Sequence, residues 1–275
     1  METSTTQIPR ELAAQYGQQA VQIIQQGAYR APSGQTVSIA DLVERAAQGT
    51  VSYPPDQPLP QTHSGPYQTC IEVANETTLA AVQRLRSAGH DPVALNFASA
   101  THPGGGFLSG ARAQEEYLAR SSGLYACLRS HPMYAFHRAR HDPLYTDYVI
   151  YSPAVPVFRA DDGALLETPY TVGMITSPAV NAGALPPERH IEIGPAMWQR
   201  ILKVLAAGIV HGHDSIVLGA WGCGAFGNDG SQIAQLFRQA LGENFRGAYR
   251  QMIFAILDWS REGRFIGPFQ RHLLG

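Results

Sequence analysis

The stretch 95–125, LNFASATHPGGGFLSGARAQEEYLARSSGLY, restricts the possible folds more than any other part of the chain. A strand pattern leads there into three consecutive glycines, Gly104, Gly105 and Gly106, and a helix pattern opens at Gln114. Glycine permits positive φ and lets the backbone approach a ligand closely. Successive backbone N–H groups next to a helix N-terminus form a concavity that suits phosphate. The stretch therefore predicts a strand, an anion-binding loop and a helix.

Two adjacent carboxylates, Glu115 and Glu116, stand at the start of that helix. A glutamate there is often structural, because the helix dipole favours negative charge. Beside an anion-binding loop, however, an acid indicates chemistry on a phosphate-bearing substrate, at a group other than the phosphate. Neighbouring helix residues point about 100° apart, so the two carboxylates cannot flank one bond as an acid–base pair. We expect one to transfer a proton and the other to hold a hydroxyl group.

A second glycine-rich loop spans 219–228 and reads GAWGCGAFGN. It lies between a strand pattern and a helix pattern, which predicts a second backbone cradle for an anion. The alternative is a tight strand–helix turn without a ligand. We favour the cradle, because a diphosphate needs donors on two sides. Its candidate ligand-binding residues are Gly222, Gly224, Ala225, Phe226 and Gly227.

From residue 67 onward, strand patterns alternate with amphipathic helix patterns. The expected strands are 69–73, 92–97, 148–151, 155–159, 172–177, 215–218 and 252–257, and the expected helices are 76–88, 114–130, 131–138, 191–211 and 231–241. This alternation predicts an α/β fold with helices on both faces of a sheet. In such sheets ligands bind outside the strand ends. Asn96, Asn181 and both glycine loops follow strands, which fits that rule.

The N-terminal part has a different character. The region 8–30 has helical spacing of apolar residues, and a short helix is expected at 38–47 with Ser38 as its N-cap. The rest of 31–66 is rich in Pro, Gly and Ser and predicts an extended connection. This part has too little apolar sequence for its own core. We therefore expect 1–66 to be a helical extension that packs on one catalytic domain, 67–275.

Composition excludes several classes of protein. The chain has 275 residues, 44% hydrophobic and 15% charged, as in ordinary globular proteins. A net charge of −2 gives no basic footprint for nucleic acid. Lys203 is the only lysine, so a Walker A phosphate loop is excluded. No apolar run approaches 18 residues, so no membrane span is expected.

Other potential reactive groups point to structural roles. Three cysteines, no CxxC motif and no signal-peptide pattern predict a reduced, cytoplasmic protein. His211 and His213 lack further ligands at a spacing that zinc would need. Cys223 has no recognisable histidine partner, and Ser121 lacks the elbow motif of serine hydrolases. We expect no metal and no cofactor.

Several motifs together resemble the bacterial-type poly(ADP-ribose) glycohydrolases, which are relatives of the macrodomains. They are LNFASA, PGGG followed by AQEE, RSSGLY, VLGAWGCGAFGN at 217–228 and FAILD at 254–258. The resemblance covers about residues 70–260. It implies a macrodomain-like mixed sheet sandwiched between helices. It also implies hydrolysis of the ribose–ribose O-glycosidic bonds of poly(ADP-ribose), which releases ADP-ribose mainly from the chain end.

The resemblance also implies roles for individual residues. Hydrolysis of a glycosidic bond needs an acid for the leaving oxygen, and the family pattern assigns proton transfer to Glu116. This residue would protonate the leaving 2′-oxygen and then deprotonate the attacking water. Glu115 and Gln114 would bind and orient a ribose. The second glycine loop would grip the diphosphate, with Phe226 near the terminal ribose.

Two more candidates rest on residue type and position. Asn96 could accept or donate to a ribose hydroxyl, or cap a turn. Phe269 could stack on adenine, as aromatic side chains do on bases, or pack in the core. Two other functions remain open: a non-catalytic ADP-ribose-binding module and a hydrolase of mono-ADP-ribosyl esters. In either case ADP-ribose or ADP-ribosylated proteins would be the partners, in processes such as the DNA damage response.

Overall fold

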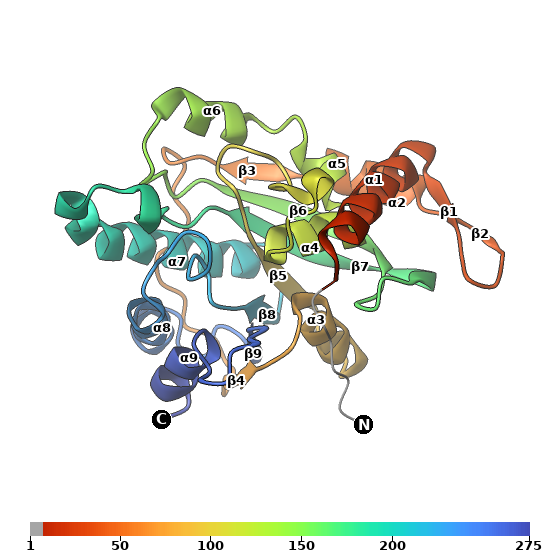
Figure 1. Cartoon of the computed structure of the whole chain (residues 1–275). Coiled ribbons are helices and arrows are strands. Elements are labelled where there is room, and N and C mark those ends of the chain that lie inside the picture. Colours follow the sequence, from red (N-terminus) through yellow and green to blue (C-terminus); the bar gives the residue numbers. More distant parts are fainter. Residues whose placement is uncertain (1–7) are drawn as a thin grey trace.

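A seven-stranded mixed sheet forms the centre of the fold, shown in Figure 1 as a computed structural model that describes residues 8–275. The strand order is β3–β6–β7–β5–β8–β9–β4. Strands β7, β5, β8, β9 and β4 run parallel, whereas β6 is antiparallel to both β7 and β3. The strand bounds are β3 Val51–Tyr53, β4 Cys70–Ala74, β5 Pro92–Phe97, β6 Val149–Arg159, β7 Leu165–Ser177, β8 Ser215–Leu218 and β9 Gln251–Ala255.

Helices cover both faces of this sheet. Their bounds are α1 Arg10–Gln26, α2 Ala40–Gln48, α3 Thr78–Ser87, α4 Gln114–Ser121, α5 Leu124–Leu128, α6 Pro132–Arg140, α7 Ile193–Val210, α8 Gly230–Gln239 and α9 Ile266–Leu273. Val93 and Leu95 of β5 pack into a core with α7 and α8, whereas Ala94 packs into a second core with α3 and α4. Successive strand residues point to opposite faces, which is why β5, covered on both faces, is apolar except at Asn96. The predicted α/β class and mixed sheet are confirmed.

Short elements complete the fold. A separate two-stranded hairpin, β1 Ala28–Arg30 and β2 Thr36–Ser38, follows α1. Short 3₁₀ helices are η1 Phe107–Ser109, η2 Ala182–Ala184 and η3 Pro187–Glu192, and η4 Ala240–Asn244 is a π-helical segment after α8. The sequence patterns did not predict β1, β2, β3 or α9. Each is short, so its periodicity is too brief to detect.

The predicted helix at 114–130 is two helices. Ser122 adopts an extended conformation between α4 and α5 and bridges to Val157 of β6. The Ser122 hydroxyl donates to the carbonyl of Leu118 (2.7 Å) and accepts from the N–H of Leu124 (3.3 Å). This serine thus competes for the backbone bonds that would continue a helix.

The predicted strands 148–151 and 155–159 are one strand, β6, interrupted by a bulge. The pairing of β6 with β7 shifts register between Ser152 and Val155, and Ala154 has φ +44°. A bulge bends its strand, and the tip of the β6–β7 hairpin reaches the loop after β4, where Thr77 donates to Asp161 (2.6 Å). The hairpin therefore forms part of a wall near the strand ends.

The N-terminal extension is more closely joined to the domain than predicted. Val51–Tyr53 pairs with β6 as an edge strand of the main sheet. Helix α2 begins at Ala40 after Ile39, and Ser38 pairs with Ala28, so the prediction of Ser38 as N-cap is wrong. Residues 1–7 of the predicted extension lie outside the described part of the chain.

One helical segment, 187–210, is long and apolar enough by length and composition alone to cross a membrane. It comprises η3 and α7, and 61% of its apolar 18-residue stretch is buried inside the protein. Residues such as Met197, Ile201 and Val204 are part of the core between α7 and the sheet. The apolar character of this helix therefore follows from its packing.

Candidate active site

A cleft of about 450 Å³ lies where the loops after β4, β5, β8 and β9 meet. Its wall includes Ser99, both glutamates at the start of α4, and Gly222 and Phe226 of the second glycine loop. Tyr16 of α1 and Asp161 of the β6–β7 turn also line it. The structure thus brings the two predicted carboxylates and the second loop together at one edge of the sheet.

The first glycine loop holds the carboxylates themselves. The Gly104 N–H donates to Glu115 Oε1 (3.2 Å), and the Gly106 N–H donates to Glu116 Oε1 (2.9 Å). The Ser99 N–H donates to Glu115 Oε2 (2.6 Å). The three glycines lie behind the carboxylates and are absent from the cleft wall. The prediction that this loop cradles phosphate is therefore not supported, because its donors already bind a different anion.

Only glycine fits at the centre of this loop. A Cβ on Gly105 would lie 2.2 Å from Glu116 Oε1 and 3.0 Å from Glu115 Oε2. The residue also has φ +58°, a conformation that L side chains rarely adopt. The missing side chain of Gly105 is thus what allows both carboxylates to pack against the loop.

Glu115 has a strongly perturbed environment. It is only 3% exposed, and burial raises its pKa to about 8, with the neighbouring Glu116 charge acting in the same direction. Hydrogen bonds from the Ser99 and Gly104 N–H groups and from Asn96 oppose the rise. Glu115 is therefore mostly protonated at neutral pH.

Glu116 is held at one oxygen only. Its Oε1 accepts from Gly106, whereas Oε2 is buried and has no hydrogen-bond partner among the described residues. An unpartnered buried carboxylate oxygen is uncommon. Because Glu116 also lines the cleft, Oε2 is a carboxylate oxygen at the cleft wall that the described residues leave without a hydrogen bond.

Gln114 and Asn96 make hydrogen bonds that hold the elements around the two glutamates in place. Gln114 Nε2 donates to the carbonyl of Leu95 (2.7 Å) and its Oε1 accepts from the N–H of Phe97 (2.9 Å), so its amide ties α4 to β5. Asn96 is fully buried, is absent from the cleft wall and donates to Thr176 Oγ1 (3.2 Å). The Asn96 side chain lies against Glu115, and its Oδ1 has no hydrogen-bond partner among the described residues. Its direct contact with a ribose stays a prediction.

The second glycine loop does face the cleft. Gly222, Gly224, Ala225 and Phe226 line it, whereas Gly227 lies outside the wall with φ +71°. The loop leads into α8, whose first turn is capped by the carboxylate of Asp229, which accepts from the Gln232 N–H (2.7 Å). The helix N-terminus itself is thus capped by Asp229, whereas the loop before it presents its backbone to the cleft. Its role as a diphosphate site stays a prediction.

Phe269 does not belong to the site. It is 0% exposed in α9, and its ring centroid lies 5.7 Å from that of Phe254 in the core. The prediction that Phe269 stacks on adenine is therefore wrong, because α9 turns that ring inward. Instead Phe97, Trp259 and Phe265 line the cleft. Trp259 is 52% exposed and follows β9 after a short loop, a position that the strand-end rule could have singled out.

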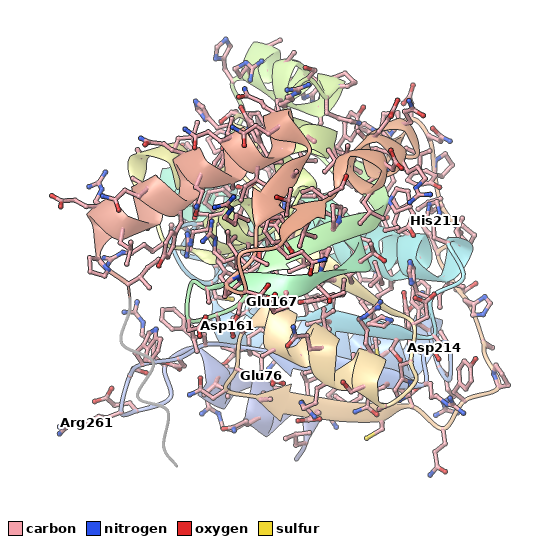
Figure 2. The ribbon with its side chains drawn as sticks, turned by 90° about the vertical axis from the view of Figure 1, so that its right-hand side faces the viewer. Glu76, Asp161, Glu167, His211, Asp214 and Arg261 are labelled. Carbon is pink, nitrogen blue, oxygen red and sulfur yellow. The ribbon has the colours of Figure 1, made fainter. Side chains whose placement is uncertain are left out.

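The wall around α1 was not foreseen. Tyr16 lies in the N-terminal extension, and Tyr117 donates to Asp161 at the β6–β7 turn. Figure 2 shows Asp161 close above Glu76, which follows β4; both line the cleft. These residues are far apart in sequence and share no motif, so only the fold brings them together.

The other residues considered as reactive groups, the histidine pair and Cys223, lie outside the cleft or are unreactive at neutral pH. His211 stacks on Tyr151 (3.5 Å between centroids), on the side of the molecule away from Asp161 and Glu76 (Figure 2). Among residues 8–275 no group of three His, Cys, Asp or Glu side chains could hold a metal ion. Burial raises the pKa of the Cys223 thiol to about 12, so Cys223 is a packing residue at neutral pH.

Comparison with known proteins places this geometry in a family. Residues 17–160 match the model of the microbial-type PARG (poly(ADP-ribose) glycohydrolase) catalytic domain. No curated protein that was compared matches the chain.

Solved structures match over most of the chain. The poly(ADP-ribose) glycohydrolase from Thermomonospora curvata has a TM-score of 0.91 and 49% identity, over 96% of this chain and 100% of that chain. Its complex with the inhibitor ADP-HPD has a TM-score of 0.89 and 50% identity, over 95% and 99%. The enzyme from Deinococcus radiodurans with ADP-ribose has a TM-score of 0.81 and 44% identity, over 86% and 98%.

Proposed function

Because this chain belongs to the microbial-type poly(ADP-ribose) glycohydrolases and shares their activity, we propose that Glu116 carries the proton transfer by which it hydrolyses poly(ADP-ribose). The observation that carries this proposal is that the two oxygens of Glu116 are in different environments. One oxygen of Glu116 is fixed by the Gly106 N–H, and the other is buried at the cleft without a partner. A general acid must be held within hydrogen-bond reach of the oxygen that it protonates.

The reaction needs one proton donor that later becomes a base. Protonated Glu116 gives its proton to the 2′-oxygen of the leaving adenosine as the bond from C1″ breaks and positive charge develops on the ribose. The Glu116 carboxylate then takes a proton from the water that attacks C1″. One water is consumed, free ADP-ribose and a shortened chain are formed, and Glu116 returns to its starting state.

Glu115 serves a different purpose in this mechanism. With its pKa raised to about 8 it is mostly neutral at pH 7, so it can donate as well as accept hydrogen bonds to ribose hydroxyls. Its two oxygens are fixed by Ser99 and Gly104. We assign it the task of orienting the ribose against Glu116.

The second loop supplies the diphosphate site in our proposal. Gly222, Gly224 and Ala225 present backbone to the cleft, and α8 follows. Gly222 has φ +76°, and its Cβ would lie 2.6 Å from Ala179 Cβ, so a side chain there would displace the wall. In this proposal Phe226, which lines the cleft, packs on the terminal ribose.

The adenine site in our proposal lies at the β9 end of the cleft. Trp259 and Phe265 offer two aromatic side chains there, where the sequence had suggested Phe269. Base–aromatic stacking contributes about 1–3 kcal/mol per base. The Trp259→Ala variant should therefore bind ADP-ribose about tenfold more weakly, which calorimetry would detect.

Incubation with purified polymer is the experiment that tests the function. We expect monomeric ADP-ribose to accumulate from the first minutes while long chains persist, as removal from the chain end requires. A non-catalytic module would bind polymer without releasing product. An ester hydrolase would act on singly modified protein and leave purified polymer intact, so that outcome would contradict the proposal.

ADP-ribosylated proteins are the carriers of polymer that we propose for the cell. The three cysteines are free thiols, which suits a reducing compartment such as the cytoplasm. A role in the response to DNA damage stays a prediction.

A further inference from the structure

Arg120 is a buried guanidinium in the wall of the cleft. It is 6% exposed and lies four residues after Glu116 on α4, so both side chains are on one side of the helix. Its only hydrogen bond among the described residues runs from Nη1 to the carbonyl of Ala111 (3.2 Å). No carboxylate of the described residues forms a salt bridge with it.

Arg159 makes a useful contrast. It too is buried at the cleft wall, at 3% exposure. Its Nε, Nη1 and Nη2 donate to the Arg120 carbonyl (3.1 Å), the Gly163 carbonyl (2.8 Å) and Gln19 Oε1 (2.6 Å), so each nitrogen has a partner. Arg159 is thus accounted for by the fold, as a tie between the hairpin, α4 and α1. Arg120 is not.

Burying a charge without a partner is costly. Burial lowers the pKa of the Arg120 guanidinium, and the nearby Glu116 carboxylate opposes that shift without forming a salt bridge. Two of its nitrogens, Nε and Nη2, make no hydrogen bond to residues 8–275 and are not among the fully buried unpartnered atoms, so they are open to the cleft. The guanidinium also lies over the Tyr117 ring (5.8 Å from its carbon to the ring centroid). A side chain in this state at a cleft is complementary to an anion that enters with the substrate, and guanidinium pairs well with phosphate.

The position of Arg120 indicates which phosphate this is. The second glycine loop follows β8, whereas Arg120 lies on α4 next to the β6–β7 hairpin, where Arg159 donates to the Arg120 carbonyl. Four helical residues separate Arg120 from Glu116, a rise of about 6 Å. In the polymer the leaving 2′-oxygen and the 5′-phosphate of the same adenosine are separated by a ribose ring, which is a similar span.

We propose that Arg120 binds a phosphate of the ADP-ribose unit on the leaving side of the scissile bond. The proposal rests on the proposed function, because the leaving unit is defined only if Glu116 protonates its 2′-oxygen. Exposed Arg112 and half-buried Tyr16 also line the cleft, and the Tyr16 ring lies beside Arg159 (4.3 Å from the guanidinium carbon to the ring centroid).

A pair of substrates isolates this contact. The first is the ADP-ribose dimer. The second is ADP-ribose joined from C1″ to the 2′-oxygen of plain adenosine, which has the same scissile bond and leaving oxygen but no phosphate on the leaving side. We expect wild-type protein to cleave the dimer with about tenfold higher kcat/KM, the effect of about 1.4 kcal/mol of binding. The Arg120→Gln variant should lose this preference and cleave the adenosine compound within about threefold of wild type.

Three controls separate the proposal from its alternatives. Arg120→Lys keeps the charge and should retain part of the preference. Arg86→Gln removes the same charge outside the cleft, where Arg86 bonds the Thr171 carbonyl, and should keep the whole preference. Unfolding temperatures exclude a folding defect.

The outcomes are distinct. An equal loss on both substrates in Arg120→Gln would show that Arg120 acts on Glu116 and would overturn the proposal. A retained dimer preference would overturn it as well. Failure of the wild-type protein to cleave either substrate would instead contradict the proposed function itself.

Discussion

At the scale of single residues, the site is an arrangement of two carboxylates around one backbone loop. The motif in the sequence predicted that the glutamates differ in role but not what separates them. The structure supplies a cause: Glu115 has both oxygens bonded to N–H groups, whereas Glu116 has one oxygen free. The phosphate that the sequence placed in this loop is replaced by the carboxylates.

Gly105→Ala tests that arrangement. The added methyl would lie 2.2 Å from Glu116 Oε1 in a residue with φ +58°, so Glu116 must move. Because general acid–base catalysis contributes about 10²–10⁴-fold, we expect kcat on polymer to fall by about 10²-fold or more. Steady-state kinetics on purified polymer would measure this fall in kcat. Gly89→Ala is the control, since Gly89 has φ +82° but open space within 4 Å; equal loss of activity in both variants would contradict the explanation.

The raised pKa of Glu115 predicts a pH dependence of stability. In the unfolded chain the carboxyl group titrates near 4.5, and in the folded protein near 8. Between these values the folded state binds a proton that the unfolded state has lost, so this residue makes the free energy of unfolding fall as pH rises from about 4.5 to 8. Below and above that window its contribution is constant.

Thermal unfolding of wild type and Glu115→Gln at pH values of about 5, 6.5 and 8 would reveal this slope. The glutamine cannot titrate, so the variant should lose the part of the slope that Glu115 causes. Parallel curves for the two proteins would show that the pKa of Glu115 is not raised in the folded state.

Asn96 and Phe269 show the limit of residue-level prediction. Both are residue types that bind nucleotides, and both stand at suitable positions in the sequence. Their burial depends on which way a strand end or a short helix is turned, and this is decided by packing against Thr176 and Phe254. The spacing of residues in the sequence does not reveal which way these side chains point.

At the scale of elements, α1 braces the catalytic loop. Arg10 Nε donates to the carbonyl of Ser109 (3.0 Å), and a Cβ on Gly17 would lie 2.6 Å from the carbonyl oxygen of Phe107. Phe107 directly follows Gly106, which positions Glu116. The N-terminal extension therefore supports the loop that holds the glutamates, although its sequence predicted only a helix of that approximate length.

Gly17→Ala reverses the usual effect of such a change. Alanine stabilises an exposed helix by about 1 kcal/mol relative to glycine, but here the methyl would push α1 away from η1. We expect a lower unfolding temperature, by about 2–4 °C or more, and reduced kcat/KM on polymer. Gly242→Ala is the matched control, because Gly242 lies in a helical turn with nothing within 4 Å. An increased unfolding temperature for Gly17→Ala would contradict the close contact.

Element boundaries were predicted well where packing and pattern agree. Strands β5 and β8 match the predicted ranges because their apolar runs end in loop residues on both sides. The helix at 114–130 was predicted as continuous, because the hydroxyl of Ser122 and the bridge to β6 are tertiary effects. The bulge in β6 escaped detection for the same reason.

At the scale of the whole molecule, the cleft is assembled from separate sections of the chain. The first section is α1, the second runs from β4 to the β6–β7 turn, and the third contains the second glycine loop and Trp259. The sequence located two of these walls through motifs. The α1 wall has no motif, and its residues acquire a role only through the arrangement of the fold.

The central claim is that Glu116 alone transfers the proton, and the Glu116→Gln variant tests it most directly. Glutamine keeps the oxygen that accepts from Gly106 but cannot release a proton. Single-turnover release of ADP-ribose from purified polymer should be slower by about 10²–10⁴-fold, while calorimetry should give ADP-ribose affinity within about threefold of wild type. Hydrolysis by this variant at close to the wild-type rate would contradict the account.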